Sequence, residues 1–176
     1  MTKITIPDTV TTIYSYAFYG NSSLVSLNSE VVGEFNLPSG VTRINSYTFY
    51  NNDLMTTISM SENVTTINSY AFYSSGLAGE VSLPNMTTVG ESAFASTAIT
   101  SIDMPSVVSI GISAFYNVST LVRVNGSYDG EFILPDTLTS IGDGAFRSVG
   151  TITDITLPFI GATGTSQNGT SEYFGY

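Results

Sequence analysis

The chain has 176 residues, of which 14 are acidic and 4 are basic, and it contains no Cys, His or Trp. Without Cys or His, it lacks a thiol nucleophile, a serine–histidine pair and the usual nitrogen and sulfur ligands of zinc. A pI near 4.1 argues against nucleic-acid binding, which needs clustered Lys and Arg. The length suits one domain, and no apolar run is long enough for insertion into a membrane.

The chain opens with a short alternating segment, Ile4-x-Ile6-Pro7, which is followed at fixed distances by Val10, Ile13 and Phe18. The same order of residues recurs along the chain. The repeated phenylalanines are Phe18, Phe49, Phe72, Phe94, Phe115 and Phe146. Their spacings are 31, 23, 22, 21 and 31 residues, so each long interval is one ordinary unit plus 8 residues. An internal repeat of this length is typical of a solenoid.

Each unit begins with an apolar-x-apolar-Pro segment, and this alternation predicts a short strand with one buried face. Proline lacks the N–H needed for a ladder bond, so it ends the strand. The segments start at Ile4, Phe35, Val81, Ile102, Phe132 and Ile155, and a copy at Ile58 has Ser61 in place of Pro. Upstream apolar residues such as Met55 and Ile99 extend the pattern to the L-x-x-L-x-L strand of leucine-rich repeats.

Units of this size bury their apolar faces by stacking in register, so that equivalent residues form continuous columns. We therefore expect residues 1–160 to form a solenoid of about six full coils and the strand of a seventh. Residues 161–176 have the composition of a Gly/Ser/Thr-rich tail or linker. A globular domain with similar strands is the alternative, but it does not explain several aligned columns in six copies.

Two eight-residue insertions, residues 28–35 and 125–132, interrupt the strand pattern after Leu27 and Val124, and both end in Gly-Glu-Phe. Loops added to one face of a solenoid often bind, so the insertions are candidates for a specialised function, with Tyr128 exposed. Drift at a tolerant site explains them equally well. A tight calcium site needs about six to eight oxygens, and the acids of the predicted sheet are too dispersed to supply them. Asp129-Gly130-Glu131 in the second insertion is the one dense acidic cluster and the alternative metal site, but we expect no metal, cofactor or catalytic group.

Strand residues that alternate with the core columns face out of the predicted sheet, and several of them are acidic. The candidate binding residues of this face are Glu34, Glu80, Asp103, Glu131 and Asp154. One hypothesis is that the face favours basic partners or loosely bound cations. The other is that the charges keep a Ser/Thr-rich sheet soluble and limit pairing at strand edges. The acids mostly occupy alternate coils, which places neighbours about 10 Å apart.

Tyrosines form two further columns, one two residues before the repeated Phe and one directly after it. The first column holds Tyr16, Tyr47 and Tyr70, and the second holds Tyr19, Tyr50, Tyr73 and Tyr116. Residues three apart share a face in a helical turn, so we expect both columns at the turn opposite the sheet. They form either a binding strip or a stack that packs coil on coil with its hydroxyl groups in water.

At these residues the repeat resembles the BspA-like leucine-rich repeat family, whose unit reads roughly apolar-x-Pro-x-x-Val-x-x-Ile-x-x-x-Ala-Phe-x-x-Cys. Residues 4–21 follow this unit closely, although the Cys position is Asn21 here and Asn, Ser, Thr or Val in later copies. The fold that follows is an α/β-type repeat solenoid. It is a right-handed superhelix with one parallel sheet, short second strands and 3-10 or helical turns on the opposite side.

The resemblance also implies a function. Such proteins are bacterial or protist surface proteins, so we expect a non-catalytic extracellular or cell-surface module that binds a host extracellular protein or a polysaccharide. The alternative is a structural spacer that has no ligand of its own and holds neighbouring domains of a larger chain. We find no polar cap at either end of the array, so we expect the native gene to continue beyond Tyr176.

Overall fold

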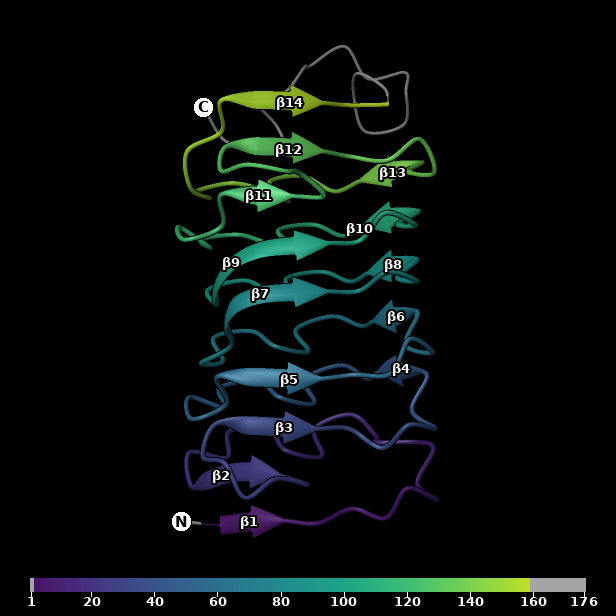
Figure 1. Cartoon of the computed structure of the whole chain (residues 1–176), viewed down its shortest axis with the longest axis vertical. Helices are drawn as coiled ribbons and strands as arrows, with labels where there is room; N and C mark the ends of the chain where they lie inside the picture. Colours follow the sequence, from purple (N-terminus) through teal and green to yellow (C-terminus); the bar gives the residue numbers. More distant parts are fainter. Residues whose placement is uncertain (1, 159–176) are drawn as a thin grey trace.

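The chain folds as a parallel β-solenoid of about seven turns, seen in a computed structural model that describes residues 2–158. The strands lie across the long axis and stack from β1 at one end to β14 at the other (Figure 1). The tail predicted at residues 161–176, and its boundary with the solenoid, lie outside the described residues.

Within residues 2–158, nine strands line one face, called the front here, and five shorter strands form a second sheet. The front strands are β1 (Thr2–Ile4), β2 (Leu24–Leu27), β3 (Glu34–Asn36), β5 (Thr57–Ser59), β7 (Ala78–Ser82), β9 (Ala98–Asp103), β11 (Arg123–Val124), β12 (Glu131–Ile133) and β14 (Asp154–Thr156). The second sheet holds β4 (Arg43–Ile44), β6 (Thr66–Ile67), β8 (Thr88–Val89), β10 (Ser109–Ile110) and β13 (Ser140–Ile141). The short second strands are therefore confirmed.

The front contains two sheets, so the prediction of one parallel sheet is wrong in this detail. The first has the order β1-β2-β3-β5 and the second β14-β12-β11-β9-β7, and β5 does not pair with β7. Figure 1 shows these two strands farther apart than other neighbours on the front. On its other side β7 pairs with β9, where the register shifts between Gly79 and Glu80 because β9 has one extra residue, Thr100.

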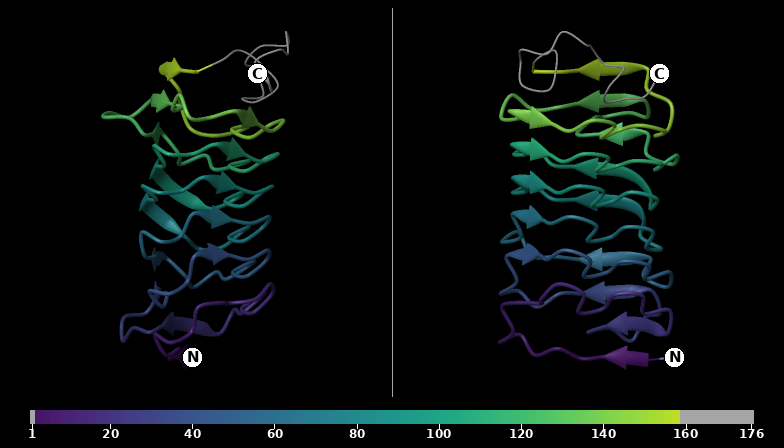
Figure 2. Two further views of the ribbon diagram at one scale, coloured as in Figure 1. Left: turned by 90° about the vertical axis from the view of Figure 1, so that its right-hand side faces the viewer. Right: turned by 180° about the vertical axis from the view of Figure 1, so that it is seen from behind.

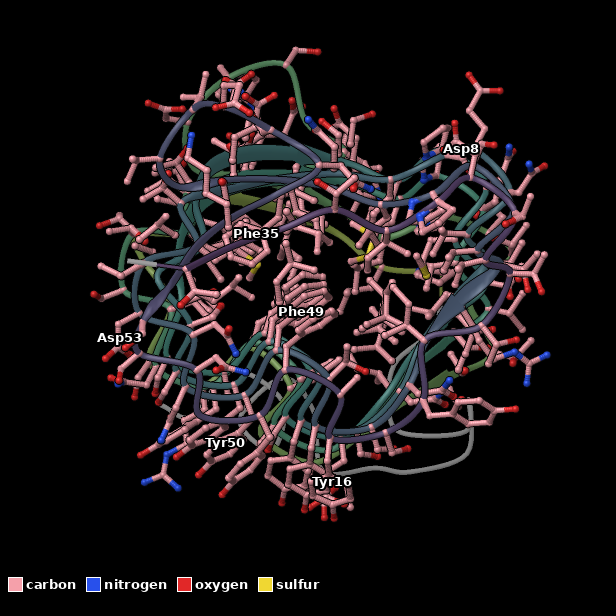
Figure 3. All side chains as sticks on the ribbon, turned by 90° about the horizontal axis from the view of Figure 1, so that it is seen from below. Asp8, Tyr16, Phe35, Phe49, Tyr50 and Asp53 are labelled. Carbon is pink, nitrogen blue, oxygen red and sulfur yellow. The ribbon has the colours of Figure 1, made fainter. Side chains whose placement is uncertain are left out.

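The predicted core columns stack as expected. Neighbouring rings of the Phe column are nearly parallel, with centroids 5.0 to 5.5 Å apart. Phe49 lies in the middle of the cross-section, and Phe35 reaches it from the front strands (Figure 3). A second column pairs in register along the second sheet, and its members are Ile44, Ile67, Val89, Ile110 and Ile141. Because its rings stack directly on one another, the Phe column fixes the spacing of the coils on the side away from the front.

The predicted 3-10 or helical turns are wrong, because residues 2–158 contain no helix of either kind. Each coil instead has left-handed residues two positions before and two positions after its Phe, with φ between 49° and 64°. Those before are Tyr16, Tyr47, Tyr70, Ser92, Ser113 and Gly144, and those after are Gly20, Asn51, Ser74, Ser96, Asn117 and Ser148. A helix needs φ near −60° at every residue, so two left-handed residues within five positions prevent it.

Each insertion adds a strand to the front without adding a turn to the second sheet. The first places Leu27 opposite Phe35 in the parallel pair β2 and β3, and the second places Val124 opposite Phe132 in β11 and β12. The predicted interruptions are confirmed, since β2 and β11 end at Leu27 and Val124. The ring of Phe35 packs edge to face against the ring of Phe49, with the two centroids 6.0 Å apart, and it fills the core space behind the extra strand.

Candidate binding surface

Both insertions fold over the outer side of the front strands (Figure 2). The glycine of each Gly-Glu-Phe ending turns the chain back, with φ of +89° at Gly33 and +94° at Gly130. A Cβ atom at these positions would collide with the Oγ1 atoms of Thr56 and Thr153, respectively. Two constraints therefore require glycine at the end of each insertion. One is the positive φ of the backbone, and the other is the close approach of the next turn.

An asparagine at the start of each insertion continues the ladder after the strand has ended. Asn28 Oδ1 accepts a hydrogen bond from the N–H of Ile6 at 2.7 Å, and Nδ2 donates to the carbonyl of Asn36 at 2.9 Å. In the second insertion, the N–H of Met104 donates to Asn125 Oδ1 at 2.5 Å, and Asn125 Nδ2 donates to the carbonyl of Ile133 at 2.9 Å. A side-chain amide has the donor and acceptor of a peptide group, so it replaces one rung. Sequence reasoning missed this role, and the shared Asn was its available signal.

The first insertion uses the predicted candidate Glu34 for its own structure. Glu34 Oε2 accepts from the Ser29 hydroxyl at 2.7 Å, and Oε1 accepts from Asn36 Nδ2 at 3.2 Å. The hydrogen bond from Ser29, followed by that from Asn36, lowers the pKa of Glu34. Lys3 donates to Glu30 in the same loop, and this bond lowers the pKa of Glu30. These contacts hold the loop against β1 and β3.

The second insertion is held by Arg123, a front residue that sequence reasoning did not assign to the outward column. Arg123 Nη2 donates to Glu80 Oε1 at 2.7 Å and to the Ser101 hydroxyl at 3.2 Å. Its Nη1 donates to Asp129 Oδ1 at 3.4 Å. Since β11 is an extra strand, Arg123 enters the outward column beside Ser101 and partly neutralises Glu80.

Glu131 and Asp154 lie on the paired strands β12 and β14, so these two acids are one strand apart rather than in alternate coils. Glu131 Oε2 accepts from the N–H of Ser127 at 2.5 Å. The Tyr128 hydroxyl donates to Asp154 Oδ2 at 2.7 Å, and this hydrogen bond to a carboxylate raises the pKa of Tyr128. Both acids therefore bind groups of the second insertion.

Asp103 differs from the other four candidate acids. Within residues 2–158 its carboxylate forms no hydrogen bond or ion pair, whereas the other four bind groups of the protein itself. The structure thus assigns most of the predicted charge to holding the insertions, and it leaves Asp103 available to a partner on the exposed front.

The tips of the insertions are apolar and exposed. Val31 and Val32 are 60% and 59% exposed, and Tyr128 at the equivalent place in the second insertion is 50% exposed, as predicted. The first loop is held by the hydrogen bonds described above, which do not involve the side chains of Val31 and Val32, whereas Tyr128 combines an exposed ring with its hydroxyl bond to Asp154. These three residues are called the loop tips below.

The tyrosines form a stacked ladder opposite the front (Figure 3). Successive rings in each column lie 4.8 to 5.0 Å apart with planes within 10°, and the members are Tyr16, Tyr47 and Tyr70 in one column and Tyr19, Tyr50 and Tyr73 in the other. Burial, followed by the charges of neighbouring tyrosines, raises the pKa of Tyr50. Tyr116 instead lies 5.9 Å beneath the guanidinium of Arg147. The ring faces inside the ladder cover one another, so edges and hydroxyl groups are what the ladder presents to a partner.

Residues 2–158 contain neither a metal-binding cluster nor a membrane-spanning helix. No group of three or more His, Cys, Asp or Glu side chains is placed to hold a metal ion in that range. The same range has no helix with the length and apolarity needed to cross a bilayer.

A family model described as BspA type leucine rich repeat region matches six copies over residues 1–122 and 126–166. No curated protein matches the chain. Among solved structures, the chain is similar to a leucine-rich repeat protein from Eubacterium ventriosum, with a TM-score of 0.59 and 18% identity over 88% of this chain and 47% of that one.

A leucine-rich repeat protein from Bacteroides ovatus gives a TM-score of 0.52 and 17% identity over 87% of this chain and 53% of that one. A leucine rich cell surface protein from Faecalibacterium prausnitzii gives a TM-score of 0.38 and 18% identity, over 88% and 78%. The likeness to the Eubacterium and Bacteroides proteins shows a common fold, and the chain spans about half of their length.

Proposed function

Because this chain belongs to the BspA-type leucine-rich repeat family, we propose that it is a non-catalytic module of a bacterial surface protein that binds a protein or a glycan. The observation that carries the proposal is the pair of matching insertions on the front. Each is built by the same Asn, the same Gly and a carboxylate, and each ends in exposed apolar side chains. A loop built twice in this way presents its tips in a fixed geometry, which favours binding.

The loop tips have the chemistry of contact residues. Burying an exposed valine against a partner contributes up to about 1.5 to 2 kcal/mol, and a tyrosine adds contact area at little cost in side-chain entropy. Between the insertions the front is polar, with Thr57, Ser59, Ser82 and Asp103 facing outward, so hydrogen bonds to a protein or glycan are available.

An array of glycans and extracellular matrix proteins, probed with this chain, tests the proposal. A ligand found in this way should bind about tenfold or more weakly to the double variant Val31→Ser, Val32→Ser and to Tyr128→Ser. Tyr14→Ser is the matched control, because Tyr14 is 76% exposed and lies outside both insertions. The proposal fails if no array member binds, or if the control weakens binding as much as the loop variants do.

A structural spacer is the second candidate, and one observation favours it. Four of the five candidate acids, and most of the tyrosine ladder, contact the protein itself. A spacer predicts that Asp103→Asn and the loop-tip variants bind the array no differently from the unmodified chain. Loss of a ligand on Asp103→Asn alone would place the binding site on the strands rather than on the loop tips.

A further inference from the structure

We propose that the gap between β5 and β7 binds an extended polypeptide segment of another protein, which enters the front as an additional parallel strand. This inference rests on the proposed binding function and narrows the partner from a protein or glycan to a polypeptide. It concerns a place that the insertions and the tyrosine ladder do not occupy.

One column of backbone amides shows the gap directly. The residue before each Pro, or before Ser61, directs its N–H toward the next rung of the front. Five of these amides donate, with Ile6 bound to Asn28 Oδ1, Leu37 to the Ser59 carbonyl, Leu83 to the Asp103 carbonyl, Met104 to Asn125 Oδ1 and Leu134 to the Thr156 carbonyl. The other two are Leu157, which follows β14, the last front strand of residues 2–158, and Met60. The next front strand after Met60 is β7, yet the Met60 N–H forms no hydrogen bond within residues 2–158.

The edge of β5 that faces the gap can be derived from its bonds to β3. The Thr57 N–H donates to the Gly33 carbonyl at 3.0 Å, and the Ser59 carbonyl accepts from the Leu37 N–H at 3.0 Å. Because alternate residues of a strand direct their backbone groups to opposite sides, those of Ile58 and Met60 face the gap.

The edge of β7 is open in the same way. The Leu83 N–H donates to the Asp103 carbonyl on β9 at 2.7 Å, so alternation turns the backbone groups of Glu80 and Ser82 toward β5. One bond, from the Ala78 N–H to the Thr56 carbonyl at 3.0 Å, closes the gap at its start. Beyond this bond, a strand would find donors and acceptors on both sides.

The gap also offers apolar contact. A pocket of about 230 Å³ lies at its wide end, lined by Met60, Ser82 and Leu83 among others. Ile58 and Met60 are only partly buried, whereas Ile102, the equivalent of Ile58, is fully buried. An inward-facing apolar side chain of an added strand would cover them.

The chain itself shows what fits between two front strands. At two other junctions it fills the space with its own strand, β2 between β1 and β3 and β11 between β9 and β12. Both strands are parallel to their neighbours and have the pattern Leu-Val-x-apolar-Asn, over residues 24–28 and 121–125. The junction between β5 and β7 has matching edges and no strand of its own, so the occupant is an extended segment of this type.

Charge adds a preference for a basic residue in the segment. In β11, Arg123 precedes the inward Val124, and the same register between Ile58 and Val81 would place an arginine beside Glu80. Glu80 already forms an ion pair with Arg123, but the front stays acidic around this point because Asp103 on β9 has no basic partner within residues 2–158. A segment with Arg or Lys at this position is therefore favoured over a neutral one.

Synthetic peptides with the sequences of residues 119–125 and 22–28 test the proposal, measured by titration calorimetry against this chain. Both should bind, the Arg-containing peptide several-fold more tightly. A peptide of residues 119–125 with Pro in place of the Val at position 124 loses an N–H, so it should bind about tenfold or more weakly. Absence of binding at millimolar concentration, or equal binding of the Pro peptide, would overturn the proposal.

Two further measurements locate the peptide. Amide hydrogen exchange should slow at Met60 on binding and stay unchanged at Leu37 and Leu83, which are already bonded. Met60→Pro removes the free N–H at the edge of β5, so it should weaken peptide binding about tenfold or more while leaving the circular dichroism spectrum intact. If an array ligand needs the loop tips while neither peptide binds, the proposed strand site between β5 and β7 is refuted and the proposed function stands.

Discussion

The second sheet and the front are made by the same repeats, yet they respond differently to changes in length. The second sheet runs unbroken from β4 to β13, and the Phe column behind it keeps rings 5.0 to 5.5 Å apart. The front accepts two extra strands and leaves one junction open. A stacked aromatic core fixes the spacing of the coils, whereas strands whose loops exit into water tolerate an added segment.

The largest expected effect on stability comes from a substitution in the Phe column. Phe94 is fully buried between two parallel rings, so Phe94→Ala should lower the free energy of unfolding by about 3 to 5 kcal/mol. Urea denaturation measures it. The control is Ile112→Ala, at a residue that is 52% exposed, with a change of about 0.5 kcal/mol or less. A loss below about 1 kcal/mol at Phe94 would contradict the role given to the Phe column.

A smaller loss in the free energy of unfolding is expected at Asn125, whose side chain completes the hydrogen-bond ladder of the front. Asn125→Gly keeps the left-handed backbone without strain but removes both amide bonds, so Met104 N–H and the Ile133 carbonyl lose their partners. We expect a loss of about 2 to 4 kcal/mol in urea denaturation. Asn63→Ala, at an exposed residue with a single 3.4 Å bond, should change stability by about 0.5 kcal/mol or less. Equal effects of the two variants would mean that Asn125 does not act as a rung.

The third prediction separates backbone strain from close approach in the front. Gly33→Ala should cost about 2 to 3 kcal/mol, because the new methyl group meets Thr56 at a positive φ. Gly20→Ala is the matched control, since Gly20 has a φ of +63° and open space around it, and it should cost about 1 kcal/mol. Denaturation curves and limited proteolysis of the first insertion test the difference. Similar losses at both glycines would sink the claim that the insertion packs tightly on β5.

The smallest effect is a pH dependence that distinguishes the first insertion. Hydrogen bonds lower the pKa of Glu34 in the folded state, so its contribution is present above the ordinary pKa of 4.5 and is lost as the pH falls through the folded value. Proteolysis of the first insertion should therefore accelerate as the pH falls below 4.5, and Glu34→Gln should remove this pH dependence. Identical acid responses of the variant and the unmodified chain would contradict it.

Much of the fold could be predicted because each core column keeps one kind of side chain. The Phe, Ile and Val columns indicated the stacking, and the Pro residues indicated where the strands end. The turns could not be predicted, because Tyr, Ser and Asn in left-handed conformations have no fixed sequence pattern and only Gly20 and Gly144 gave a hint. The tyrosine columns, which are three residues apart, therefore led to a prediction of helical turns.

The candidate site was predicted less well than the fold. The acids were found by their alternation, but their partners come from the insertions and from Arg123, which lies on a strand that the repeat count did not include. The open junction follows the copy of the repeat in which Ser61 takes the place of Pro. That replacement does not indicate an open junction, and only the strand order shows that β5 and β7 are unpaired.

Amide hydrogen exchange of the free protein tests the central claim, that the front is complete at every junction except the one between β5 and β7. The claim predicts slow exchange at the five bonded amides, which are Ile6, Leu37, Leu83, Met104 and Leu134. It predicts exchange near the rate of an unstructured peptide at Met60. Protection of Met60 equal to that of Leu83 would mean that the junction is closed, and would contradict the account.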